Sequence, residues 1–296
     1  MHFMCFYMWS SFIIFSQKIQ HFQGLQSFRT KIYLSGMKEK IFFAHANGFP
    51  AEVYTDLFNR LPQFDISYIS KLGHGKYTLN NSWKDITREI IDYFEANYTE
   101  AVWAIGHSFG AVVLAFAAEQ RPDLFKGLIL MDPPVLSRKI RWAMAISQIF
   151  GISHKIMPLA KKAANRSDHF PSRAFLSEKL RNKTLFKNFS AASFNNYIEY
   201  GWEEADKGIK LAFNKELESK IFALTHPFYS PLKLSIPSYY LYASLGEIAD
   251  TRSIDSIMHL FPKTEFIPIK NGGHLFPFEE TEKCVEELNA ILNLKT

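Results

Sequence analysis

Cysteine is scarce in this sequence of 296 residues, which has only Cys5 and Cys284, at opposite ends of the chain. A small scaffold held together by disulfides needs more cysteines at closer spacing, so that class of protein is excluded. The sequence also lacks the clustered cysteine and histidine spacing of a zinc site, and we expect no metal. Two cysteines so far apart fit a reducing compartment, and we expect a cytoplasmic protein.

The apolar run near the N-terminus is too short to cross a membrane. Phe3–Phe15 contains thirteen mostly apolar residues, whereas a spanning helix needs roughly twenty. No lysine or arginine precedes the run and no clear small-residue cleavage site follows it, which argues against a signal peptide. We interpret residues 1–36 as an extension outside the fold, with a weak membrane anchor or a poor signal peptide as alternatives, and we expect the folded domain to span 37–296.

The composition excludes disordered, collagen-like and low-complexity proteins. Hydrophobic residues make up 47% of the chain and charged residues 21%, which allows a large buried core. Phenylalanine and tyrosine are abundant, with 28 and 13 residues, and indicate a bulky apolar interior or an apolar pocket. The length suits an α/β domain that carries an insertion.

Acidic residues are nearly absent from Ser137–Lys187. This segment contains twelve lysine or arginine residues but only Asp168 and Glu178 as acids, in a chain whose overall net charge is +5. No nucleic-acid recognition motif accompanies the basic residues, so we expect no nucleic-acid partner. The charges alternate with apolar residues as on amphipathic helices, which favours solvated helical faces. Attraction to an anionic membrane surface or an anionic substrate is the alternative.

From Lys40 onward, short β-type apolar runs alternate with longer helical runs. This order predicts a mostly parallel sheet with helices on both faces. The expected strands are Ile41–Ala44, Ile66–Ile69, Val102–Ile105, Leu128–Met131, Ser238–Ala243 and Phe266–Ile269. The expected helices of the core are Glu52–Leu61, Ser82–Asn97, Phe109–Gln120 and about Glu279–Leu294.

About a hundred residues between Pro134 and Ile236 lack a convincing strand pattern. They contain helical runs, among them Ile140–Ile152 and Phe194–Glu204. A sheet interrupted in this way predicts a core domain with an inserted helical lid at about 137–235.

A G-x-S-x-G motif, Gly106-His107-Ser108-Phe109-Gly110, joins an expected strand to an expected helix. Such a tight turn holds its central residue in a strained conformation and exposes the side chain, while the flanking glycines prevent collisions. Ser108 therefore lies at the positive end of a helix, where a developing negative charge is stabilised. The position of the motif makes Ser108 the candidate nucleophile.

A serine nucleophile needs a general base, and His274 is the best placed of the ten histidines. It follows two glycines on the loop after the last expected strand, so it should reach the sheet edge at which Ser108 lies. For His45, His74 and His107, which lie beside the other functional loops, we favour packing or loop bracing.

The acid that orients the histidine has three candidates. Such a group fixes the histidine tautomer and must lie at a strand end near His274. Glu247, which follows the Ser238–Ala243 strand, is preferred. Asp132, directly after the Leu128–Met131 strand, is second and could instead cap the chain as it leaves the sheet. Asp250 is third.

Two backbone N–H groups should form an oxyanion hole. The amide of Phe109, next to the nucleophile, is one. The other should come from the turn after the first strand, where Gly48 allows close approach and Pro50 stiffens the exit. Phe49 is the preferred donor in this turn and Asn47 the alternative.

The turn His45–Pro50, the Gly73-His74-Gly75 loop, the G-x-S-x-G turn and the late Gly273-His274 together resemble the α/β-hydrolase superfamily, over about Lys40 to Leu294. Among its members the chain looks most like lid-bearing serine esterases. The resemblance implies a Ser-His-acid triad and neither a metal nor an organic cofactor. Two features depart from the family pattern: there is no clear Gly-x-x-Asp after the Pro237 strand, and the first two strands of the full fold are not evident before Ile41.

The expected reaction is hydrolysis of a small-molecule ester or thioester with an apolar, medium-chain acyl group. The expected helix Ile140–Ile152 is apolar on more than one face, which favours an acyl pocket lined in part by the lid, with simple lid packing as the alternative. Two other functions stay open. One is a cofactor-free hydrolase that cleaves a C–C bond of a diketone, and the other is a catalytically silent fold that binds an apolar ligand or a partner.

Overall fold

The computed structural model describes residues 38–80, 82–135, 138–153, 157–224, 230–245, 254 and 257–293. The chain divides between Glu39 and Lys40 into two units, and the elements below belong to the second apart from the first residue of β1. The predicted N-terminal extension, residues 1–36, lies outside the described residues.

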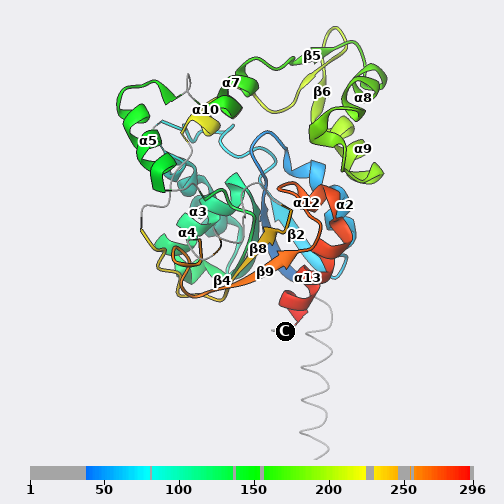
Figure 1. Ribbon diagram of the computed structural model, residues 1–296. Coiled ribbons are helices and arrows are strands. Elements are labelled where there is room, and N and C mark those ends of the chain that lie inside the picture. Colours follow the sequence, from blue (N-terminus) through cyan, green and yellow to red (C-terminus); the bar gives the residue numbers. More distant parts are fainter. Residues whose placement is uncertain are drawn as a thin grey trace, which may run out of the picture. The chain divides into compact units, whose positions relative to one another are not determined.

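A six-stranded sheet has the strand order β2-β1-β3-β4-β8-β9 (Figure 1). The pairs β1–β3, β3–β4, β4–β8 and β8–β9 are all parallel. The predicted sheet is confirmed, and each expected strand is present, β8 with the expected bounds and the other five with slightly different ones. The strands are β1 (Glu39–Ala44), β2 (Phe64–Tyr68), β3 (Val102–His107), β4 (Phe125–Met131), β8 (Ser238–Ala243) and β9 (Thr264–Ile269).

The central strands are buried on both faces because helices cover both sides of the sheet. Along β1, Phe43 packs into one core and Phe42 into the other, as the alternation of side chains in a strand requires. Strand β3 is buried at all of its residues, which explains its continuous apolar run.

The helices that cover the sheet are those predicted, with two interruptions. Figure 1 shows α3 and α4 on one side of the strands and α2, α12 and α13 on the other. The run expected as one helix from Glu52 begins as a 3-10 turn before α2, and the last helix is preceded by the separate short α12. The bounds are η1 (Ala51–Tyr54), α2 (Thr55–Asn59), α3 (Lys84–Asn97), α4 (Phe109–Gln120), α12 (Phe276–Glu279) and α13 (Thr281–Asn293).

The insertion between β4 and β8 is not purely helical, contrary to expectation. It contains a three-stranded antiparallel sheet of order β5-β7-β6. Its elements are α5 (Arg138–Ile149), α7 (Pro158–Ala164), β5 (His169–Phe170), α8 (Arg173–Arg181), η3 (Thr184–Phe186), α9 (Ala191–Tyr200), β6 (Trp202–Glu204), β7 (Ile209–Leu211) and α10 (Lys215–Ala223).

The strands of the insertion escaped prediction because each has only two or three residues. Such lengths are too short to show the alternation by which a strand is recognised. The helix expected over Phe194–Glu204 was wrong in its last part, because α9 ends before Gly201 and β6 follows. Gly208, with φ +81°, then turns the chain from β6 into β7.

Candidate active site

Ser108 occupies a strained turn between β3 and α4. Its φ of 53° and ψ of −116° lie in a region that residues with side chains rarely adopt. A Cβ on Gly106 would lie 2.7 Å from the Cα of Ala111, and a Cβ on Gly110 would lie 2.4 Å from the carbonyl oxygen of Ala44. Both glycines are therefore required by the backbone, as the sequence motif predicted.

The side chains of Ser108, His274 and Asp132 form one hydrogen-bonded chain. Ser108 Oγ lies 3.0 Å from His274 Nε2, and His274 Nδ1 lies 2.6 Å from Asp132 Oδ2. A carboxylate can only accept, so Nδ1 carries the proton and Nε2 accepts from the serine hydroxyl. The Asp132 side chain is 3% exposed and that of His274 33%, so the acid is enclosed while the imidazole reaches solvent.

Asp132 is held rigidly at the end of β4. Its φ is +46°, its amide donates to the carbonyl of Leu241 at 2.8 Å, and its Oδ1 accepts from the amide of Ala243 at 3.3 Å. Both oxygens of the carboxylate are thus engaged. The other two candidates for the acid, Glu247 and Asp250, lie outside the described residues.

The loop that carries His274 is braced by a carboxylate. Asn271 has a φ of 62°, and the amide of Gly273 donates to Glu279 Oε2 at 2.9 Å. Burial raises the pKa of Glu279, while the bond from Gly273 and the nearby His274 oppose this rise. The side chain of Glu279 therefore acts as a local clamp on this loop.

Of the two predicted oxyanion donors, the Phe109 amide opens helix α4, where the first N–H groups have no acceptor inside the helix. The Phe49 amide already donates to the carbonyl of Ala46 at 3.2 Å, across a turn in which Gly48 has φ +81°. Phe49 can therefore contribute only as a shared donor. The alternative, Asn47, uses its side-chain Nδ2 to donate to the carbonyl of Glu218 at 3.0 Å.

The insertion holds this turn from the outside. Glu218, on α10, is buried, and a Cβ on Gly48 would lie only 2.7 Å from its Oε1. Arg166 neutralises the carboxylate at 2.8 Å and donates to the hydroxyl of Tyr197 at 2.7 Å. Burial is the largest influence on Glu218 and raises its pKa, while Arg166 opposes the rise.

His45 and His74 are loop braces in the structure. His45 Nδ1 donates to the carbonyl of Ala46 at 2.8 Å, and His45 Nε2 accepts from the amide of Leu72 at 2.7 Å. Full burial lowers the pKa of His45 to about 4. His74 Nε2 accepts from the amide of Asn214 at 3.0 Å, which ties its loop to the insertion.

His107 links the site to Tyr54, a residue that sequence reasoning did not single out. His107 Nδ1 lies 2.7 Å from the Tyr54 hydroxyl, and its Nε2 lies 2.9 Å from the carbonyl oxygen of His274. Desolvation, with a smaller contribution from His274, lowers the pKa of His107 to about 3, so the ring is neutral at physiological pH. Tyr54 and Glu218 carried no local signal, because their partners lie 53 and 171 residues away.

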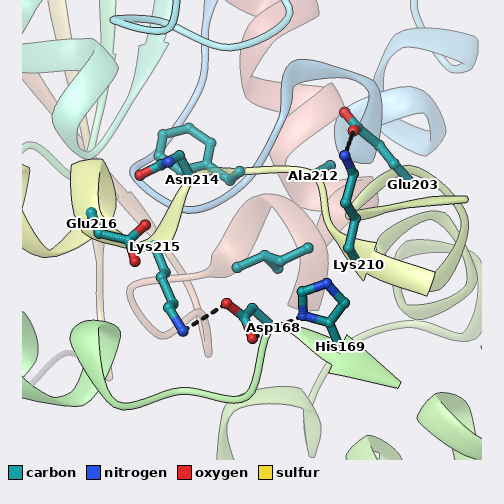
Figure 2. Close-up of a pocket in the computed structure, with 10 residues that line it drawn as sticks. Asp168, His169, Glu203, Lys210, Ala212, Asn214, Lys215 and Glu216 are labelled. Atoms are coloured by element: carbon teal, nitrogen blue, oxygen red, sulfur yellow. Dashed lines mark hydrogen bonds and ion pairs between the residues drawn. The ribbon is translucent and has the colours of Figure 1, made fainter. Parts of the chain in front are cut away.

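Two cavities lie on the insertion side of the domain. Figure 2 shows the first, of about 280 Å³, in which Lys215 and Asp168 point toward each other and form an ion pair at 2.6 Å. The second, of about 240 Å³, is lined by residues that include Pro50, Lys71 and Trp202. Neither of these two cavities is lined by Ser108 or His274.

The match to a known family covers Ser108, Asp132 and His274. The sequence model of the α/β-hydrolase fold family matches residues 84–281. The chain belongs to the α/β-hydrolase fold family.

Among curated proteins, the type I acyl-CoA thioesterase mpaH of Penicillium roqueforti (strain FM164) is 28% identical over 108 residues, which are 30% of this chain and 25% of that protein. A second such enzyme, from Penicillium brevicompactum, is also 28% identical, over 107 residues, with the same coverage. The chain thus matches about a quarter of the length of these relatives.

Solved structures share the fold over most of the chain. E-2-(acetamidomethylene)succinate hydrolase has a TM-score of 0.69 at 16% identity and covers 86% of this chain and 91% of its own. The thioesterase domain of the curacin biosynthetic pathway has a TM-score of 0.63 at 13% identity, with the same coverage. Lpx1, a peroxisomal α/β-hydrolase of Saccharomyces cerevisiae, has a TM-score of 0.67 at 17% identity and covers 86% of this chain and 76% of its own.

Within the part of the chain that the structure describes, no helix combines the length and the apolar character needed to cross a bilayer.

The buried His45 predicts a specific pH dependence of stability. Its pKa is about 4 in the folded protein against 6.5 for an unperturbed histidine. Between these pH values the unfolded chain binds a proton that the folded protein does not. The free energy of unfolding should therefore decrease as the pH is lowered through this window, by about 1.4 kcal/mol per pH unit for this group. The contribution is fully present above the window.

Urea unfolding of the wild type and His45→Gln between pH 4.5 and 8 measures this effect. Below pH 6, the free energy of unfolding should decrease with falling pH less steeply in the variant than in the wild type, by about 1.4 kcal/mol per pH unit. Above pH 7 the two profiles should run parallel. Equal slopes below pH 6 would contradict the assignment of a neutral, buried His45.

Proposed function

We propose that the chain is a serine hydrolase that cleaves a carboxylic ester or thioester of an apolar acyl group through a covalent acyl-enzyme. The observation that carries this proposal is the hydrogen-bonded chain from Ser108 through His274 to Asp132, with distances of 3.0 and 2.6 Å. A serine aligned with a neutral imidazole, and an imidazole aligned with a buried carboxylate, are what nucleophilic acyl transfer requires.

In the proposed first half-reaction, Ser108 Oγ attacks the acyl carbonyl while His274 Nε2 takes the hydroxyl proton. The resulting imidazolium is stabilised by Asp132 and returns the proton to the leaving alcohol or thiol, which departs with the electrons of the broken bond. In the second half-reaction water attacks the acyl-enzyme while His274 Nε2 takes a proton from it, and the imidazolium then gives this proton to Ser108 Oγ as the bond between the acyl group and Ser108 breaks. The free acid and the original serine are the products.

We assign the stabilisation of the tetrahedral intermediates to the Phe109 amide, with Phe49 as the second donor. The Phe109 N–H lies at the start of α4, where the helix dipole adds to the attraction for an oxyanion. Phe49 would share its proton between Ala46 and the oxyanion, since its amide already makes the turn bond of 3.2 Å. One donor of such a hole contributes about 3 kcal/mol to lowering the barrier.

Asp132 is our choice for the acid, in place of the originally preferred Glu247. The 2.6 Å contact with His274 Nδ1 and the low exposure of Asp132 support it. Its left-handed φ of +46° directs the carboxylate from the end of β4. Its position at the end of β4 makes this geometry possible, because β4 lies beside β3, the strand that leads to Ser108.

Two observations favour an apolar acyl group and a thioester among the possible substrates. The Phe49 ring lies within 5.3 Å of the Phe278 ring and 5.6 Å of the Tyr197 ring, measured between centroids, so the turn beside the site is lined by aromatic side chains. The curated relatives are named acyl-CoA thioesterases. We therefore extend the proposal to thioesters as well as oxygen esters.

Substitution of the three side chains tests the mechanism. Ser108→Ala should abolish labelling by a fluorophosphonate probe, and Ser108→Ala and His274→Gln should each lower kcat/KM for an activated ester by about 10⁴-fold or more. Asp132→Asn should lower kcat/KM by about 10⁴-fold because the imidazole adopts the wrong tautomer.

Glu247→Gln and Asp250→Asn are the matched controls and should keep activity within about twofold of the wild type. A large loss in Glu247→Gln with little loss in Asp132→Asn would assign the acid to Glu247 instead. A folded wild type that neither reacts with the probe nor turns over any ester would indicate a catalytically silent fold.

A panel of esters and thioesters with acetyl, butanoyl, hexanoyl and octanoyl groups tests the substrate class. Each methylene that enters an apolar site should raise kcat/KM by about fourfold, which corresponds to about 0.8 kcal/mol. The maximum should lie at a medium chain length. Activity on acetyl compounds alone would exclude the apolar acyl site, and turnover of vinylogous diketones with inert esters would indicate C–C bond hydrolysis.

We also propose that helix α5 contacts an anionic membrane surface. Its solvent-facing side carries Trp142, Ile146 and Ile149, which are 59%, 53% and 81% exposed and lie on one face at helical spacing. Phe150, 72% exposed, follows directly after the end of the helix. Between Asp132 and Asp168 the sequence has seven lysine or arginine residues and no acid. An exposed apolar helix face within a basic segment is typical of helices that lie in the interface of an anionic bilayer.

Sedimentation with phosphatidylcholine vesicles, with and without phosphatidylserine, tests this contact. The protein should bind the anionic vesicles more tightly, and an Ile149→Ser/Phe150→Ser variant should bind about tenfold or more weakly because it loses two inserted side chains. Phe175→Ser, at an exposed apolar position on α8, is the control and should bind as the wild type does. Loss of a dimer in the double variant, with no vesicle binding by any form, would assign the face to self-association.

A further inference from the structure

The hydroxyl of Tyr54 connects two loops that come from opposite ends of the sequence. The amide of Ala46 donates to this hydroxyl at 3.2 Å, and the hydroxyl lies 2.7 Å from His107 Nδ1. On its other side, His107 Nε2 lies 2.9 Å from the carbonyl oxygen of His274. One chain of hydrogen bonds therefore runs from the turn after β1 to the backbone of the histidine proposed as the base.

The direction of every proton in this chain is determined by chemistry. The carbonyl of His274 can only accept, so His107 Nε2 carries a proton and donates it. The ring is neutral, so His107 Nδ1 has no proton and must accept from the Tyr54 hydroxyl. The Ala46 amide can only donate, and it does so to the lone pairs of the same hydroxyl. We find one arrangement that satisfies all four groups.

Burial makes this arrangement difficult to replace. Tyr54 is 1% exposed and His107 fully buried, so water cannot readily substitute for a missing partner. The ring of Tyr54 is also packed among aromatic side chains, with centroid distances of 4.6 Å to Phe43 and 4.5 Å to Phe278. The hydroxyl is thus held at a defined position between the two loops.

Each of the two loops has a brace of its own that does not reach the other. The turn after β1 is held from the insertion, where Asn47 Nδ2 donates to the carbonyl of Glu218. The loop before α12 is held by the bond between Gly273 and Glu279. The hydrogen bonds of Tyr54 and His107 are different, because they connect the two loops to each other.

We propose that Tyr54 and His107 are positioning residues that set the distance between the oxyanion turn, Ala46–Phe49, and His274. This inference rests on the proposed function, in which the donor at Phe49 and the imidazole of His274 act on the same tetrahedral intermediate. The Tyr54–His107 bridge keeps these two groups in register although they lie on loops that follow β1 and β9. A misplacement of about 1 Å between such groups costs on the order of a hundredfold in rate, which is why a rigid link matters.

Tyr54→Phe removes the hydroxyl and keeps the aromatic ring, so it tests the bridge with little change in packing. We expect kcat for an activated ester to fall by about 10- to 100-fold, with KM within about twofold of the wild type and an unchanged pH profile. Tyr98→Phe is the matched control. It also removes a partly buried tyrosine hydroxyl, which is bonded to Ser67, and it should leave kcat unchanged.

Two His107 variants separate positioning from simple packing. His107→Gln keeps a side chain that can donate to His274 and accept from Tyr54, whereas His107→Leu can do neither. His107→Gln should retain at least tenfold more activity than His107→Leu. The double variant Tyr54→Phe/His107→Leu should be no slower than His107→Leu alone, because both changes break the same connection. Losses that simply multiply would contradict the bridge.

Hydrogen exchange provides a readout that does not depend on activity. In Tyr54→Phe the amides of Ala46–Phe49 and Gly272–Leu275 should both exchange faster than in the wild type, whereas Tyr98→Phe should leave both segments unchanged. Unchanged exchange in either segment would overturn the bridge, whatever the kinetics. If both segments exchange faster in Tyr54→Phe but the wild type has no hydrolase activity, the proposed function is refuted and the bridge is established.

Discussion

The last hydrogen bonds of the parallel ladder determine where the reactive side chains stand. The amide of Ser108 donates to the carbonyl of Met131 at 2.8 Å, and the amide of Asp132 donates to the carbonyl of Leu241 at 2.8 Å. These bonds extend the β3–β4 and β4–β8 pairings by one residue beyond the strands. The strained turn at Ser108 and the left-handed turn at Asp132 therefore begin from a rigid edge, and the two side chains leave the sheet on adjacent strands.

Around this edge, the loops that carry the other groups are each held by a glutamate. The carboxylate of Glu279 accepts from Gly273, and that of Glu89 accepts from Gly73 at 2.7 Å. Glu218 presses its carboxylate against Gly48. Burial raises the pKa of all three glutamates. A backbone N–H or an arginine that donates to a buried carboxylate offsets the cost of burying it. The carboxylate in turn holds a glycine-containing loop in one conformation, although glycine loses more conformational freedom on folding than other residues.

Local patterns predicted most of the sheet and half of the site. The strands were predicted from apolar runs and the turn at Ser108 from a motif whose glycines have a steric reason. That His274 would reach the edge of the sheet at Ser108 followed from the place of its loop in the strand order. The acid was harder, because Asp132 and Glu247 both follow strands and only a three-dimensional distance to His274 distinguishes such candidates.

The remaining contacts of the site had no signal in the sequence. Tyr54 is the last residue of the 3-10 turn η1, and its hydroxyl meets His107 only because the sheet places β1 beside β3. The bond from Asn47 to Glu218 spans 171 residues and depends on how the insertion folds back. The short strands of the insertion show too few residues for any periodicity. Long-range pairing of single polar side chains is therefore the part that composition and pattern could not supply.

The contact between Glu218 and the turn after β1 has a mechanical consequence. Helix α10 cannot withdraw from the sheet without breaking the bond to Asn47 and removing the carboxylate that fills the space beside Gly48. The turn Asn47–Phe49 would then lose its support from the insertion. Displacement of α10 and a well-ordered turn at Asn47–Phe49 thus exclude each other. In the proposed mechanism, where this turn helps to hold the oxyanion, a substrate admitted by such a displacement would have to be enclosed again before the backbone could stabilise its negative charge.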